Sequence, residues 1–216
     1  MGFVSAVPRI VQARIEDEAE GMWTEVEREL TQLLCSKVFT GLIGVSAYKR
    51  LLKPNGQPDP SLCKSTAHEL IQSTDLKNGI REFGSREKPK AREWTKPICR
   101  AISPKNNPNG SWWFDEELVQ RWALRYPTGT PNRKQQILDS IRPMLAVCLD
   151  WNDFTDLRVL RPTFSIPVIT GQGAHKPIVH SPDDPRYKVN VFLIGGFTQV
   201  FVPFVNPSDN LQYNWG

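Results

Sequence analysis

The stretch SWWFDEELVQRWALRY, residues 111–126, joins a short aromatic run directly to an amphipathic run. Aromatic residues are typical of β-strands, and Asp115 stands immediately before apolar residues at helical spacing, where it can cap a helix. Successive side chains of a strand point to opposite faces, so Trp112 and Trp113 are expected on opposite sides of a sheet. The stretch therefore predicts a strand that leads without a loop into a helix.

Upstream of this stretch the pattern is helical. Apolar residues recur at helical spacing, with glutamates between them, at Ile15, Ala19, Met22, Trp23, Val26, Leu30, Leu33 and Leu34. This predicts a long amphipathic helix, which either packs on a core or docks on a partner protein. A second helix is predicted from Ser61 to Ser73.

Downstream, a helix is predicted from Arg133 to about Val147, and strands follow. The predicted strands are rich in Val, Ile and Phe and are bounded by Gly or Pro: Leu157–Leu160, Ile166–Ile169, Val189–Ile194 and Val200–Val205. Trp94–Ile102 is a further candidate strand. Helices first and strands later predict an α+β fold with a mostly antiparallel, strand-rich C-terminal part. The organisation is either a helical region 1–75 with an α+β region 76–216, or one domain overall.

Composition narrows the class of protein. The chain has 216 residues, of which 39% are hydrophobic and 23% charged, as is typical of globular proteins. No apolar run reaches the roughly 18 residues that a membrane-spanning helix needs. The 4 cysteines form no CxxC pair and no secretory signal precedes them, so we expect free thiols and a cytoplasmic location.

The positive charge is concentrated in one segment. Lys77–Lys105 contains nine basic and three acidic residues, a net charge of +6, whereas the whole chain carries +4. Such a segment attracts phosphates or acidic surfaces, which predicts a nucleic acid or an acidic protein as partner. A solvated loop rich in Lys and Arg is the simpler alternative.

Motifs of common enzyme classes are absent. The chain contains no GxGxxG, GxxxxGK[ST], GxSxG or HExxH. His175 and His180, followed by Asp183 and Asp184, are the candidate metal ligands, but the prolines around them indicate a surface loop. We therefore expect no metal.

A second informative run is Gly195-Gly196-Phe197-Thr198-Gln199. Adjacent glycines let a ligand approach the backbone closely, and the amide of Gln199 can hydrogen-bond a sugar hydroxyl without adding charge. The alternative is a hairpin that carries an ordinary exposed glutamine.

The runs 110–126 and 195–199 together resemble the ADP-ribosyltransferase-like superfamily and its NAD glycohydrolase toxins, over residues 95–205. The resemblance implies that NAD is the substrate and that its nicotinamide–ribose bond is cleaved. It gives Gln199 the catalytic role of orienting the ribose, and Arg100 the role of holding the pyrophosphate. The remaining residues of this site approach or wall off the NAD: Ser111, Trp112, Trp113, Gly195 and Gly196.

The chain also departs from that superfamily. Classical transferases place a catalytic glutamate on a late strand, but no glutamate follows Glu117. The sequence therefore leaves three hypotheses: an NAD-using enzyme, a non-enzymatic basic binding module, or a subunit of a protein assembly.

Overall fold

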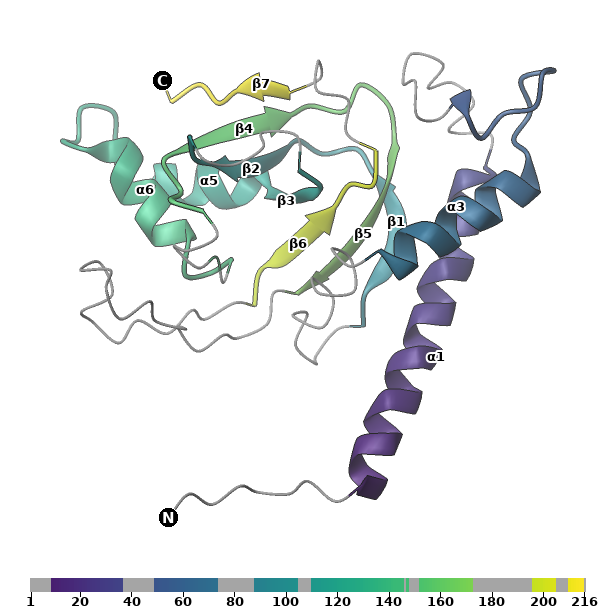
Figure 1. Cartoon of the computed structure of the whole chain (residues 1–216). Helices are drawn as coiled ribbons and strands as arrows, with labels where there is room; N and C mark the ends of the chain where they lie inside the picture. The colour runs from purple at the N-terminus through teal and green to yellow at the C-terminus, as the bar shows by residue number, and fades with distance from the viewer. Residues whose placement is uncertain are drawn as a thin grey trace.

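An antiparallel sheet forms the centre of the molecule in a computed structural model that describes residues 9–36, 49–73, 88–104, 110–145, 147, 152–172, 196–204 and 210–215 (Figure 1). Within these residues the sheet has seven strands in the order β1-β5-β6-β3-β2-β4-β7, and every neighbouring pair is antiparallel. The strands are β1 (Lys90–Trp94), β2 (Ile98–Ile102), β3 (Trp112–Asp115), β4 (Asp156–Leu160), β5 (Ile166–Gln172), β6 (Thr198–Phe201) and β7 (Asn210–Gln212). The expected α+β class is confirmed.

Helices α1 (Arg9–Leu34) and α3 (Pro60–Gln72) pack on each other beside the β1 edge of the sheet (Figure 1). Asp59 begins α3, because its side chain accepts a hydrogen bond from the Ser61 N–H at 3.0 Å. The shared core is made of buried residues from both helices and from two strands: Val26, Leu30, Leu34, Cys63, Ala67, Ile71, Ile169 and Phe201. Both helices predicted upstream are therefore present.

Helices α5 (Glu116–Ala123) and α6 (Arg133–Ile141) lie beside β2, β3 and β4 (Figure 1). Asp115 starts α5 as predicted, since its Oδ1 accepts from the Glu117 N–H at 2.9 Å. Helix α6 ends well before the predicted Val147, because Pro143 lacks the N–H that another helical turn needs. Buried residues of the helices and the sheet form this second core: Cys99, Phe114, Leu118, Val119, Ile137, Leu138, Ile141, Leu157 and Val159.

The other face of the sheet has its own core, formed by strand residues and by Val202, which directly follows β6: Ile98, Trp113, Leu160, Val168, Val200 and Val202. Alternation along β3 explains the split, since Trp112 packs into the α1–α3 core whereas Trp113 belongs to this third core. The prediction that the two tryptophans face opposite ways is confirmed. We call the face of the sheet that carries this core the inner face.

Three local predictions differ from the structure or lie beyond it. Of the strand predicted at Trp94–Ile102, Ile98–Ile102 forms β2 and Trp94 is the last residue of β1, because Thr95–Pro97 breaks the ladder at a proline without an N–H. The rest of β1 was not predicted. Strand β7 was not predicted. The strand predicted at Val189–Ile194 lies outside the described residues, and the division into 1–75 and 76–216 stays a prediction. Among the helices of the described residues, none has the length and apolar character needed to cross a membrane.

Candidate functional site

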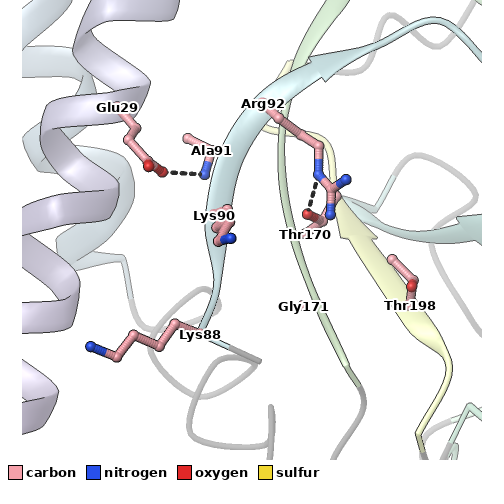
Figure 2. Close-up of a pocket in the computed structure, with 8 residues that line it drawn as sticks. All are labelled: Glu29, Lys88, Lys90, Ala91, Arg92, Thr170, Gly171 and Thr198. Atoms are coloured by element: carbon pink, nitrogen blue, oxygen red, sulfur yellow. Dashed lines mark hydrogen bonds between the residues drawn. The ribbon is translucent and has the colours of Figure 1, made fainter. Parts of the chain in front are cut away.

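A cavity of about 600 Å³ opens at the β1 edge of the sheet (Figure 2). Its walls come from α1, the β1 segment, β5 and β6, and the described residues that line it are Glu29, Lys88, Lys90, Ala91, Arg92, Thr170, Gly171 and Thr198. A volume of this order lies within the roughly 300–1,000 Å³ of small-molecule sites. The cavity is therefore large enough for a ligand of nucleotide size.

Strand pairing gathers the polar side chains of this cavity. Lys90 is directly opposite Thr170, and Arg92 is two residues further along the same face of β1. Thr170 in turn pairs with Val200, so Thr198 is on the same inner face of β6. The register of three neighbouring strands thus places two cations and two hydroxyls together, although β1 and β6 are about a hundred residues apart in sequence.

The cavity is electropositive. Lys88, Lys90 and Arg92 outnumber its one acidic residue, and within the described part of the chain none of the three forms an ion pair. Arg92 is fixed, because its Nε donates a 2.7 Å hydrogen bond to the Oγ1 of Thr170, a residue that is only 1% exposed. Such an arrangement favours anionic groups, since charge-assisted hydrogen bonds to phosphate or carboxylate are the strong ones.

Glu29 closes the cavity from the helix side. Its Oε2 accepts a hydrogen bond from the backbone N–H of Ala91 at 2.9 Å (Figure 2). Strand β1 is at the edge of the sheet, so this bond satisfies an N–H that no further strand covers. Glu29 thereby holds α1 against β1 and brings a carboxylate to a site that is otherwise cationic.

Arg100, predicted to hold a pyrophosphate, lies half-buried on β2. Its Nη1 donates to the backbone oxygen of Trp112 at 3.1 Å, and burial lowers the pKa of its guanidinium. A Cβ at Gly110 would overlap this guanidinium, so Gly110 is the residue that lets Arg100 lie there. The Nε1 of Trp113 also donates to the Gly110 oxygen, at 3.1 Å. Arg100 and Trp113 are thus brought together around Gly110.

The other predicted site residues are dispersed. Gln199 pairs with Phe114 on the face that α5 and α6 cover, and its Nε2 donates to the Leu145 oxygen at 2.8 Å. Trp112 contacts Phe201 edge to face within the core under α1 and α3, with the two ring centroids 5.1 Å apart. Gly196 is exposed with a φ of 83°, which favours glycine, and Ser111 is half-buried ahead of β3.

None of the predicted site residues that the structure describes lines the cavity. Gly195 lies outside the described residues. The basic segment Lys77–Lys105 includes three charged residues that line the cavity: Lys88, Lys90 and Arg92. Sequence reasoning missed Glu29, Thr170, Gly171 and Thr198, because no local motif distinguishes them.

Thiol and metal chemistry find little support in the described residues. Cys35, Cys63 and Cys99 are free, but burial and the hydrogen bond with Cys35 raise the pKa of Cys63 to about 12. Burial also raises the pKa of Cys99, so neither buried thiol is an activated nucleophile. No group of three or more potential metal ligands gathers in the part of the chain that is described. His175, His180, Asp183 and Asp184 lie outside it.

Comparison with known proteins identified a distant structural similarity. No family model and no curated protein matches the chain. The chain is similar to a chain in the solved structure of Rhs1-CT in complex with cognate immunity protein RhsI1, with 10% sequence identity over 60% of this chain and 84% of that chain. The TM-score is 0.32, which is too low to carry a conclusion about function. The cavity therefore supplies the structural evidence for a function.

Proposed function

We propose that the chain binds a phosphate-bearing nucleotide in the cavity at β1, and that NAD is the first candidate ligand. The observation that supports this is the group of Lys88, Lys90 and Arg92 in a cavity of about 600 Å³. Phosphates suit these cations, and the cavity has the volume of a small-molecule site. NAD is chosen among nucleotides because of the sequence resemblance at 110–126 and 195–199.

As an NAD glycohydrolase, the chain would cleave the bond between nicotinamide and ribose. Nicotinamide leaves with the electron pair of that bond, water adds to the ribose carbon, and one proton is released. The ribose becomes oxocarbenium-like in the transition state, so a fixed carboxylate such as that of Glu29 is stabilising nearby. The roles of Gln199 and Arg100 stay predictions, to be tested with the Gln199→Ala and Arg100→Ala variants.

The binding step is tested by calorimetric titration with NAD. We expect Arg92→Ala to weaken binding by about 10- to 100-fold, because it removes a charge-assisted contact to phosphate. The matched control is Arg121→Ala, which removes an exposed arginine of α5 far from the cavity lining. Equal affinities of wild type and Arg92→Ala would contradict the proposal.

The catalytic step is tested by measuring free nicotinamide after incubation with NAD. Release by wild type that falls in Glu29→Gln would support the NAD glycohydrolase. Saturable NAD binding without release would leave a nucleotide-binding module and would overturn the enzymatic part.

A basic binding module is the second candidate, favoured by the exposure of Lys88, Lys90 and Arg92 along an edge strand. Such a surface attracts nucleic acid through its phosphates, or an acidic protein. Titration of nucleic-acid binding against salt tests it, since several phosphate contacts give a steep negative slope of log affinity against log salt. A flat response would reject it.

A partner protein on the N-terminal helix also stays a prediction. Val26, Leu30 and Leu34 of α1 are buried in the core with α3, so this part of the helix is used by the fold itself. These three side chains are therefore not available to a partner. Light scattering at high protein concentration tests assembly, and a strict monomer would argue against self-assembly.

A further inference from the structure

The two signs of charge in the cavity come from different elements. Lys88, Lys90 and Arg92 belong to the β1 segment, whereas Glu29 comes from α1, with its carboxylate directed toward β1 (Figure 2). A ligand that is only anionic is attracted by the three cations and repelled by Glu29. A ligand that combines phosphates with hydrogen-bond donors can contact both kinds of group.

The carboxylate of Glu29 is positioned to accept such donors. One oxygen accepts from the Ala91 N–H at 2.9 Å, which fixes the orientation of the group. A carboxylate has about four acceptor sites, so the hydrogen bond to Ala91 leaves capacity for a ligand. The vicinal hydroxyls of a ribose are donors of this kind, and acidic side chains bind ribose hydroxyls in dinucleotide-binding folds.

We infer that the cavity selects ribonucleotides over 2′-deoxyribonucleotides and that the carboxylate of Glu29 binds the ribose hydroxyls. This inference rests on the proposed function, and it narrows the ligand class from phosphate-bearing compounds to ribonucleotides.

The test compares ADP, 2′-deoxy-ADP and inorganic pyrophosphate in calorimetric titrations of the full chain. We expect ADP to bind about 10-fold more tightly than 2′-deoxy-ADP, because a hydrogen bond to a charged group is lost.

Glu29→Gln is the informative variant, since its amide oxygen still accepts from the Ala91 N–H while the charge is removed. We expect the ratio of ADP to 2′-deoxy-ADP affinity to fall toward one and pyrophosphate to bind more tightly. Glu25→Gln is the matched control, because it removes the same charge from an exposed position of α1 and should change neither quantity. If Glu29→Gln does not fold, Glu29→Asp withdraws the carboxylate by one methylene and should lower the same ratio.

The outcomes separate the inference from the function on which it rests. Equal binding of ADP and 2′-deoxy-ADP by wild type overturns the role of Glu29 and leaves the phosphate site standing. Absence of binding by all three compounds overturns the proposed function itself.

Discussion

The two ends of one sheet use charge in opposite ways. At the end formed by β1, β5 and β6, which we call the pocket end, cationic side chains line a cavity without ion pairs among the described residues. At the end formed by β2, β3 and β4, which we call the paired end, two ion pairs hold charged side chains. Glu116 is 4% exposed and accepts two hydrogen bonds from Arg161, at 3.0 and 2.7 Å, and Lys134 pairs with Asp156 at 2.8 Å.

This difference separates structural charges from charges that are available to a ligand. A buried carboxylate such as that of Glu116 requires a counter-charge, and the forked guanidinium of Arg161 supplies one with suitable geometry. The exposed cations at the pocket end pay no such desolvation cost and can remain unpaired. Substitutions at both ends can test whether the ends differ in charge alone or also in packing.

The largest effects are expected from the cores. Leu138→Ala at the paired end and Leu30→Ala at the pocket end each remove a side chain that is 0% exposed. Each should lower the free energy of unfolding by about 2–5 kcal/mol, through lost burial and the cavity left behind. Urea unfolding measures both. Two separate transitions, with Leu30→Ala shifting only one, would show that the helical region 1–75 unfolds independently of the rest.

The next effect distinguishes the ends by charge. Arg161→Ala should lower the free energy of unfolding by about 1–3 kcal/mol, because it leaves the buried carboxylate of Glu116 without its partner. Lys90→Ala removes an exposed side chain of the pocket end and should change it by less than about 0.5 kcal/mol, as surface substitutions usually do. Chemical denaturation of both variants, with NAD affinity as a second readout, checks the contrast. Adding Glu116→Gln to Arg161→Ala should recover stability, since no buried charge remains.

A smaller effect is expected between the two ends, at Gly110. Gly110→Ala forces the Arg100 guanidinium to move and breaks its hydrogen bond to the Trp112 oxygen, at a cost of about 1–2 kcal/mol. Gly21→Ala is the control, since no atom lies within 4 Å of a Cβ there and alanine favours the helix by about 1 kcal/mol. Thermal unfolding should move in opposite directions for the two variants. A Gly110→Ala protein as stable as wild type would contradict the close packing of Arg100.

The smallest effect is a pH dependence at the paired end. Burial alone would raise the pKa of Asp156, but hydrogen bonds from Lys134, Trp215 and the Leu157 N–H together hold it below its usual range. A lowered pKa in the folded state stabilises the protein above the unfolded value of about 3.9, and this contribution is lost as pH falls through the folded pKa. Asp156→Asn should therefore be less stable than wild type at neutral pH. The difference should shrink below about pH 4, and a difference that persists unchanged in acid would exclude this origin.

Local rules explain which parts of the fold the sequence revealed. Asp115 caps α5 and the two tryptophans of β3 face opposite ways, because both features depend only on neighbouring residues. The same holds for the amphipathic stripe of α1. Strand β1 ends at Trp94 and β2 begins at Ile98, and Pro97 stands in the break between them.

The residues that line the cavity could not be predicted from neighbouring residues in the same way. Glu29 is one of several glutamates on the polar side of α1, and Thr170 and Thr198 are ordinary strand residues. Gln199 stood out in sequence beside its glycines, yet in the fold its amide binds the Leu145 oxygen. Which polar residue faces a cavity depends on strand register and helix placement, and these are properties of distant segments.

The sequence by itself determined the class of secondary structure, the helix starts and the concentration of positive charge, since composition, capping and periodicity act within a few residues. Only the tertiary structure decided that β1 pairs with β5 beside β6, and that α1 lies across the β1 edge. Those two arrangements bring Lys90, Arg92 and Glu29 to one cavity. The physical reason is that strand pairing and helix packing depend on free energies summed over contacts between distant segments, whereas capping and periodicity depend on neighbouring residues.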